Sequence, residues 1–186
     1  MGRWEPDAAG RLREAAMALY AEQGFDGTTV ADIADRAGVT ARTFFRHFAD
    51  KREVLFAGSE ELERRMVDAL TAAPRTAEPM DAITVALLAA AELFADRRDH
   101  SRRRQAVIAA TPELREREFI KMASLVTAFT EALRQRGVEP ATASLAAETG
   151  IAVFRVAFER WVAGPDDTDL AEVLRGTLAE LSELTA

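Results

Sequence analysis

Residues 28–51, TTVADIADRAGVTARTFFRHFADK, predict two short helices joined by a tight turn. Apolar residues near the start of this stretch recur at helical spacing, at Val30, Ile33 and Ala34. Thr29 precedes this run and Asp32 follows three residues later, which predicts a capping box with Asp in place of the usual Glu. Gly38 predicts the end of the first helix, because glycine readily adopts the left-handed conformation of a helix C-terminus.

The second helix is predicted to follow the turn directly, with Thr40 as its N-cap. Phe44 and Phe48 lie four residues apart and are expected to face inward. The polar side chains that can point outward are Arg42, Thr43, Arg46 and His47. Two short helices with a glycine-containing turn form the helix-turn-helix motif, whose second helix enters the major groove of DNA. The alternative is a plain helical hairpin in a bundle, with a solvated polar face.

A dense and ordered set of residues extends over about residues 11–55, namely Gly24, Phe25, Gly27, Thr28, Thr29, Val30, Ile33, Ala34, Ala37, Gly38, Val39, Thr43, Phe45, Phe48 and Lys51. This pattern resembles the N-terminal signature of the tetracycline-repressor (TetR/AcrR) family of bacterial transcriptional regulators, of the actinobacterial type. The motif and the resemblance together predict DNA contacts by Thr29, Thr40, Ala41, Arg42, Thr43, Phe45, Arg46, His47 and Lys51.

Position 45 departs from the family pattern. The family usually has Tyr there, and the resemblance implies that its hydroxyl touches a DNA phosphate. Phe45 keeps the aromatic ring and lacks the donor. We expect Arg42, where a small residue is common in the family, to supply a replacement contact.

Composition indicates a helical globular protein. The chain has 186 residues, of which 48% are hydrophobic, and it contains only 10 Gly and 6 Pro. Cysteine is absent, which excludes disulfides and thiolate chemistry. The N-terminal residues lack the apolar core of a signal peptide, and no stretch approaches the roughly 20 apolar residues of a membrane helix. The expectation is a soluble cytoplasmic protein with no membrane partner.

The charge distribution favours DNA binding at one place. The net charge of −7 opposes general affinity for nucleic acid. Residues 38–52, in contrast, hold four basic side chains and one acidic side chain. Asp50 is expected to cap the next helix with Lys51 in its first turn. A Lys at that position interacts unfavourably with the helix dipole. We therefore expect Lys51 to bind a phosphate together with the free N–H groups of the helix N-terminus.

Residues 73–81, APRTAEPMD, hold two of the six prolines and no apolar period, and therefore mark a boundary. We expect a helix-turn-helix domain over residues 1–55, a connecting fourth helix over 50–72, and a helical ligand-binding and dimerisation domain over 73–186. The other helices are predicted at residues 7–23, 82–95, 112–136, 140–164 and 166–184.

Residues 97–104, RRDHSRRR, form a dense charge run. One interpretation is a solvated turn with an exposed helix start. The other is an anion site, because arginines near a helix N-terminus can fork onto a carboxylate or phosphate. Together with the following AATPELRERE, the run resembles actinobacterial family members thought to sense acyl-CoA-like ligands.

An apolar cavity is expected within residues 82–163, lined by Phe94, Leu125, Phe129 and Phe154 from three of the predicted helices. If the arginines at 102–104 lie at its mouth, the effector is an amphiphile with an anionic head. The predicted ligand site therefore comprises these four residues with Arg102, Arg103 and Arg104.

The last two predicted helices carry more large apolar surface than one core face usually needs. The family resemblance implies that they pair with their symmetry mates in a four-helix dimer interface. The residues predicted there are Phe158, Trp161, Leu170, Leu174, Leu178 and Leu181. The alternative is that this stripe at helical spacing is ordinary core.

Enzymatic chemistry fits the sequence poorly. The two histidines, His47 and His100, are isolated, and the chain has no HExxH, phosphate-binding glycine loop or Gly-x-Ser-x-Gly motif. We expect no catalytic residues, metal or cofactor. The predicted protein is an all-α, dimeric transcriptional regulator, typically a repressor. It is expected to bind a palindromic operator and to be released from it by a small apolar or amphiphilic ligand, such as an acyl-CoA-like compound. The alternative is a helical small-molecule-binding or interaction module without DNA binding.

Overall fold

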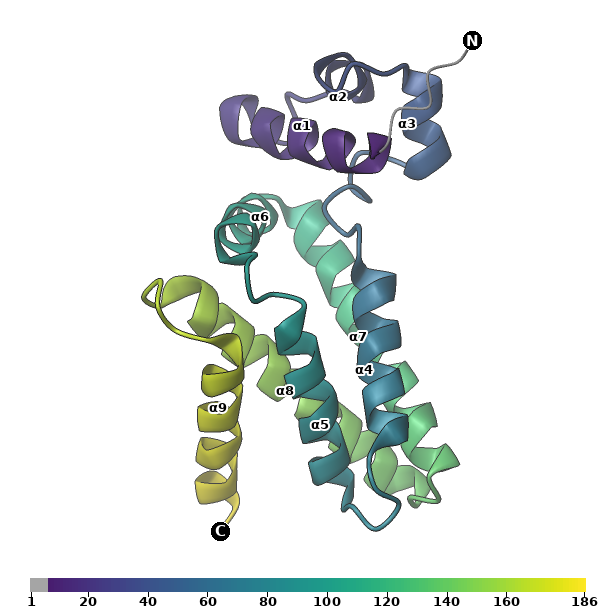
Figure 1. Ribbon diagram of the computed structural model, residues 1–186, viewed down its shortest axis with the longest axis vertical. Helices are drawn as coiled ribbons and strands as arrows, with labels where there is room; N and C mark the ends of the chain where they lie inside the picture. The colour runs from purple at the N-terminus through teal and green to yellow at the C-terminus, as the bar shows by residue number, and fades with distance from the viewer. Residues whose placement is uncertain (1–6) are drawn as a thin grey trace. The chain divides into compact units, whose positions relative to one another are not determined.

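The computed structural model describes residues 7–186, and over that range its regular elements are all α-helices (Figure 1). They are α1 (Ala8–Gln23), α2 (Val30–Arg36), α3 (Ala41–His47), α4 (Ser59–Ala72), α5 (Pro79–Glu92), α6 (Arg98–Ala110), α7 (Pro112–Gln135), α8 (Pro140–Ala163) and α9 (Leu170–Thr185). The predicted all-α fold class is confirmed. Residues 1–6, which the predicted DNA-binding domain includes, lie outside the described residues.

The chain divides into two compact units, and the division differs from the predicted one. The first unit combines the chain up to Ala57 with Arg103–Glu118, and the second combines Gly58–Arg102 with Phe119–Ala186. Both α6 and α7 therefore contribute to each unit. Residues 103–118, which the predicted second domain includes, pack with the first unit, because Ile108 and Leu114 are completely buried in its core. Leu114 has polar neighbours in the sequence and Ile108 lies in the short apolar run AVIAA, and neither pattern tells which unit the side chain packs in.

The helix-turn-helix forms as its local signals predict. The Thr29 hydroxyl accepts from the Asp32 N–H at 3.1 Å, and the Asp32 carboxylate accepts from the Thr29 N–H at 2.8 Å, which is the predicted capping box. Gly38 follows α2 with a φ of 67°, a left-handed conformation that costs little without a side chain. Beneath the motif, the apolar faces of α1, α2 and α3 meet in one core through Leu12, Ala16, Ile33 and Phe44.

The predicted start of the fourth helix at Asp50 is wrong, because α4 begins at Ser59. Between them, the N–H groups of Leu55 and Phe56 donate to carbonyls only three residues earlier, at 3.0 and 3.2 Å. Val54, Leu55 and Phe56 are all buried, and three consecutive residues cannot share one face of an α-helix. Gly58, with a φ of 96°, separates this 50–57 segment from α4. Asp50 consequently caps a turn and not a helix, through the N–H groups of Arg52 and Glu53.

The core of the second unit is built around α8, which packs on α5 and α9, while α4 packs on α5. Small residues on α8 let the helices approach closely. A Cβ on Gly150 would lie 2.5 Å from the Ile83 side chain of α5, for example. By length and composition α8 also qualifies as a membrane-spanning helix, and 44% of the qualifying window is buried inside the protein. That burial is what a core helix of this unit requires.

Half of the predicted dimer interface lies inside the chain. Trp161, Leu170 and Leu174 are buried in the core of the second unit, so they are not available to a second copy. The reason is that α9 folds back on α8 and α5 and uses these side chains for internal packing. Phe158, Leu178 and Leu181 are only partly buried at the edge of the same core.

Candidate nucleic-acid interface

The exposed face of α3 is held in place by buried aromatic rings. Phe44 is completely buried and Phe48 nearly so, with ring centroids 5.6 Å apart. The Thr40 hydroxyl caps the helix by accepting from the Thr43 N–H at 3.2 Å. The remaining side chains of this short helix, and the two N-cap threonines, are exposed except for half-buried Thr43: Thr29, Thr40, Ala41, Arg42, Phe45, Arg46 and His47. The structure thus gathers these predicted contact residues on the helix-turn-helix.

Arg42 and Arg46 are exposed and have no hydrogen-bond or ion-pair partner within residues 7–186. Other arginines of this unit are engaged, as in the two hydrogen bonds from Arg36 to Glu22 at 2.7 and 3.0 Å. A guanidinium without an internal partner can form bidentate hydrogen bonds to a phosphate or to the edge of a guanine. The helix α3 therefore presents two available cations, Arg42 near its start and Arg46 in its last turn.

Phe45 is an exposed aromatic side chain on the same helix, with 58% of its surface accessible. Its ring packs edge-on against Phe44 with centroids 5.4 Å apart, so its orientation is supported from the core. The ring offers an apolar surface in place of the hydroxyl donor of a tyrosine. Apolar side chains of this kind can contact the methyl group of thymine in the major groove.

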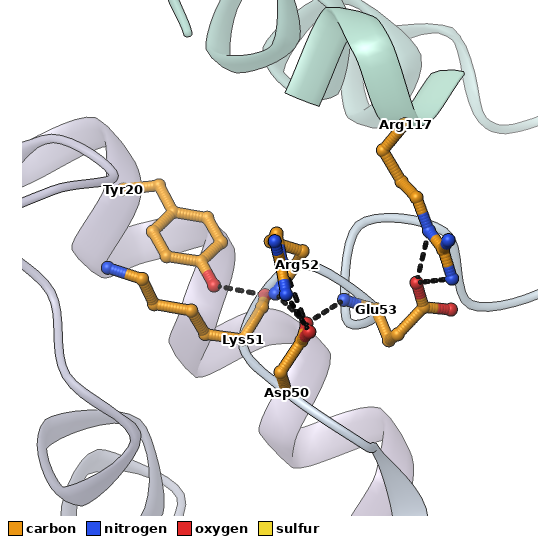
Figure 2. A network of polar contacts seen from close by, with 6 residues as sticks. All are labelled: Tyr20, Asp50, Lys51, Arg52, Glu53 and Arg117. Atoms are coloured by element: carbon orange, nitrogen blue, oxygen red, sulfur yellow. Dashed lines mark hydrogen bonds and ion pairs between the residues drawn. The ribbon is translucent and has the colours of Figure 1, made fainter. Parts of the chain in front are cut away.

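Lys51 is engaged within the protein. Its Nζ donates to the carbonyl oxygens of Phe25 and Thr28, both at 2.8 Å, and lies 4.3 Å from the centre of the Phe25 ring. The Tyr20 hydroxyl donates to the Lys51 carbonyl at 2.6 Å (Figure 2). Burial, with a smaller contribution from Asp50, raises the pKa of Tyr20, which keeps the hydroxyl a donor. Lys51 is not in the first turn of a helix, so the argument that placed it on a phosphate does not hold. Its visible role is to position the loop before α2.

The other end of the 50–57 segment is held by α6 and α7. Arg117 of α7 donates from Nε to Glu53 at 2.7 Å, an ion pair visible in Figure 2. Arg104 of α6 donates to the Leu55 carbonyl at 2.7 Å and pairs with Glu118 at 3.0 Å, with its guanidinium over the Phe56 ring. Burial lowers the pKa of Arg104, against the opposing effect of Glu118. These contacts explain why residues 103–118 belong to the DNA-side unit.

The predicted anion site at residues 102–104 is not assembled. Arg102 belongs to the second unit, where it donates to the carbonyls of Val162 at 2.8 Å and Gly164 at 2.6 Å and pairs with Asp166. Arg104 belongs to the first unit, as described above, and Arg103 is exposed. Successive residues of a helix point in different directions, which is why the run does not converge on one anion.

A hollow of about 330 Å³ opens in the second unit. It is lined by Phe94, Ala95, Arg98, Trp161, Asp166, Asp167, Thr168, Asp169 and Leu170. Of the four predicted cavity residues only Phe94 borders it, and Leu125, Phe129 and Phe154 are buried elsewhere in the core of this unit. The sequence analysis missed Arg98, the first residue of α6, and the α8–α9 loop. No group of three or more potential metal ligands occurs within residues 7–186.

A three-helix helix-turn-helix unit joined to a helical second unit is an architecture found in DNA-binding regulators. Residues 12–57 match the family model of bacterial regulatory proteins of the tetR family, and residues 77–186 match the MftR C-terminal domain. The second match covers more than half of the chain. The protein belongs to the TetR family and carries a C-terminal domain of the MftR type.

Relatives and solved structures agree with this assignment. The repressor KstR2 of Mycobacterium tuberculosis is 39% identical over 88 residues, 45% of this chain and 42% of KstR2. MftR of the same organism, named for mycofactocin biosynthesis, is 30% identical over 114 residues, 61% of this chain and 58% of MftR. FadR from Bacillus subtilis, solved in complex with stearoyl-CoA, shares the fold with a TM-score of 0.63 at 20% identity, over 91% of this chain and 95% of that chain.

The chain spans about half the length of the curated relatives it matches. These relatives are transcriptional regulators, and the prediction of a regulator and not an enzyme is confirmed.

Proposed function

We propose that the protein is a dimeric transcriptional repressor that binds a palindromic DNA operator in the cytoplasm and is released from it by a small molecule. The observation that carries this proposal is the pair of unpartnered arginines on α3, Arg42 and Arg46, on a helix fixed by buried Phe44 and Phe48. Arg42 reads a base edge near the helix N-terminus, and Arg46 lies on the backbone or an adjacent base. Thr29, Thr40, Ala41, Thr43, Phe45 and His47 complete the surface.

Lys51 supports this surface indirectly, through the loop that leads into α2. By holding the carbonyls of Phe25 and Thr28, it fixes the loop that leads into Thr29 and α2. Its contribution to DNA binding is therefore positional, in place of the direct phosphate contact expected from the sequence.

Dimerisation follows from the way such motifs read DNA. Two recognition helices must lie about 34–36 Å apart to meet successive major grooves on one side of the duplex. Of the six residues predicted at the interface, Phe158, Leu178 and Leu181 are only partly buried, at the edge of the α8–α9 core, and remain available to a partner. A symmetric pairing of α8 and α9 in two copies would bury them.

The effector is a small apolar or amphiphilic molecule bound by the second unit, and its preference for one spacing of the two recognition helices couples it to DNA binding. An acyl-CoA is the first amphiphile to test, because Bacillus subtilis FadR, which shares the fold, was solved with stearoyl-CoA. The arginines expected to hold its head group do not converge, however.

The experiment is a selection of bound sequences from random double-stranded DNA, followed by a mobility shift with the enriched sequence. A palindromic consensus bound with two chains per site supports the proposal. A failure to enrich any sequence, with a folded protein, would favour a helical binding module without DNA affinity.

A further inference from the structure

Two adjacent strips of side chains lie on the exposed side of α3. With about 3.6 residues per turn, residues four apart share a face, so Ala41 and Phe45 form an apolar strip. Arg42 and Arg46 form the cationic strip beside it, and all four residues are exposed. A single exposed aromatic ring means little by itself in a folded protein. This ring, however, stands beside two arginines that have no partner within residues 7–186, on the second helix of the helix-turn-helix.

The orientation of the Phe45 ring is supported from the core. Its plane stands at 83° to the ring of Phe44, with centroids 5.4 Å apart, and Phe44 is completely buried. The outer part of the Phe45 side chain, 58% of its surface, remains accessible. A side chain that is already oriented loses little conformational freedom when it makes a contact. Phe45 therefore offers a preformed apolar surface to a ligand of α3.

The chemistry of α3 decides which features of a base it can recognise. A phenylalanine ring forms no hydrogen bond to a base edge, so it cannot tell the O4 carbonyl of thymine from the amino group of cytosine. The apolar feature in the major groove is the C5-methyl group of thymine. The sequence of α3, ARTFFRH, contains no Asn or Gln to pair with adenine and no Asp or Glu to accept from cytosine. The hydroxyls of Thr40 and Thr43 lie 3.1 Å apart and hydrogen-bond each other. The base-specific contacts that α3 favours are thus guanine through arginine and a methyl group through the apolar strip.

We infer that Phe45 is a specificity-determining residue that recognises the 5-methyl group of one pyrimidine in each operator half-site, with Ala41 beside it. The inference rests on the proposed function, and it assigns base recognition to a position where the family's usual tyrosine is expected to touch a phosphate. It has a further consequence for methylated DNA. The methyl group of 5-methylcytosine occupies the same place in the major groove as that of thymine, so Phe45 accepts either base.

The test compares pairs of operators that differ only in this methyl group. In the operator enriched by selection, each thymine of the half-site is replaced in turn by deoxyuridine, symmetrically in both half-sites. We expect one position to be sensitive, with a loss of about fourfold for each half-site and about fifteenfold for the palindrome, as for one buried methyl group. At that position, a 5-methylcytosine–guanine pair should be bound more tightly than a cytosine–guanine pair by the same factor. The salt dependence should not change, because no phosphate contact is lost.

Variants at position 45 assign this discrimination to the ring. Phe45→Ala should reduce both affinity ratios, thymine over uracil and 5-methylcytosine over cytosine, to about one. Phe45→Leu keeps an apolar side chain and should retain most of the discrimination. Each ratio compares two DNAs bound by the same protein, so a change in the stability of a variant cancels. Phe119→Ala, which removes an exposed phenylalanine from α7 in the second unit, is the matched control and should leave both ratios unchanged.

Ratios near one at every position in the wild type would overturn the inference, as would ratios that Phe45→Ala leaves unchanged. A ring that lies against the sugar–phosphate backbone would give the first result, with Phe45→Ala weakening all of the operators equally. These outcomes contradict the role of Phe45 alone, because the operator is still bound. A folded protein that enriches no DNA sequence contradicts the proposed function, and the inference with it.

Discussion

Arginine is concentrated in two short stretches of this chain, on α3 and on α6, and the two stretches use it differently. Arg42 and Arg46 on α3 have no partner within residues 7–186. Arg102 and Arg104 on α6 donate to backbone carbonyls and pair with carboxylates of their own units. The difference shows that a local excess of positive charge does not reveal whether a cation is available to a ligand. The presence or absence of internal acceptors decides that.

The largest effect should come from removing both α3 arginines that have no internal partner, and it should be a loss of operator affinity. Arg42→Ala with Arg46→Ala should weaken operator binding about a hundredfold, roughly 3 kcal/mol for two lost contacts. The free energy of unfolding should change by less than about 0.5 kcal/mol, because neither side chain has an internal partner. Mobility shifts and urea unfolding measure the two quantities.

Arg75→Ala, which removes an exposed and unpartnered charge from the α4–α5 loop, is the matched control. It should leave operator affinity nearly unchanged. Operator selection with Arg42→Ala alone sharpens the assignment. If the preferred sequence stays the same, Arg42 contacts the DNA backbone and not a base.

Removing an arginine that has internal hydrogen-bond and ion-pair partners should instead lower the free energy of unfolding. Arg104→Met deletes the hydrogen bond to Leu55 and the pair with mostly buried Glu118, and should lower the free energy of unfolding by about 2 kcal/mol. Arg115→Met, an exposed position on α7 of the same unit, should cost less than about 0.5 kcal/mol. Equal urea midpoints for the two variants would refute the structural role of Arg104.

Lys51 and Arg52 should show the same difference in stability effect, at a smaller magnitude, between a cation with internal partners and an exposed one. Lys51→Met keeps most of the side-chain volume and removes the two hydrogen bonds to Phe25 and Thr28, which should cost about 1–2 kcal/mol. Arg52→Met breaks only an exposed pair with Asp50 and should cost about 0.5 kcal/mol or less. If the Arg52 variant unfolds as readily as the Lys51 variant, Lys51 does not hold the loop.

The smallest effect concerns an engaged carboxylate. Hydrogen bonds from the Thr29 hydroxyl and backbone lower the pKa of Asp32 below its ordinary value of 3.8. A carboxyl whose pKa is lower in the folded state stabilises the fold above its unfolded pKa, and this stabilisation is lost as the pH falls through the folded pKa. The stability difference between wild type and Asp32→Asn should thus be constant near neutral pH and shrink below about pH 4. A difference that does not change with pH would mean that the Asp32 charge adds nothing to the cap.

The helix-turn-helix was predictable because its signals are local. Thr29 and Asp32 cap α2 across three residues, Gly38 ends it, and Thr40 caps α3. Each contact joins residues within one turn, so spacing in the sequence is enough to identify it. The exposed face of α3 followed from the same periodicity.

The partners of the engaged cations were not predictable in this way. Lys51 bonds carbonyls 23 and 26 residues away, Arg104 bonds Leu55 at a separation of 49, and Arg102 bonds Val162 at a separation of 60. Every residue has a backbone carbonyl, so the sequence near these cations does not identify which carbonyl accepts the hydrogen bond. The 50–57 segment was misread as a helix for a related reason, since its three consecutive buried residues are explained only by tertiary packing.

The salt dependence of operator affinity tests the contrast between the two kinds of cation most directly. Between about 50 and 200 mM salt, the logarithm of the binding constant falls linearly with the logarithm of the salt concentration, with a slope set by the number of phosphates that the protein neutralises. We predict that Arg42→Ala with Arg46→Ala flattens this slope by about one unit, through the lost backbone contact of Arg46, and that Lys51→Met leaves it unchanged while weakening binding through the loop. An unchanged slope in the α3 double variant, with a flatter slope in Lys51→Met, would contradict the account.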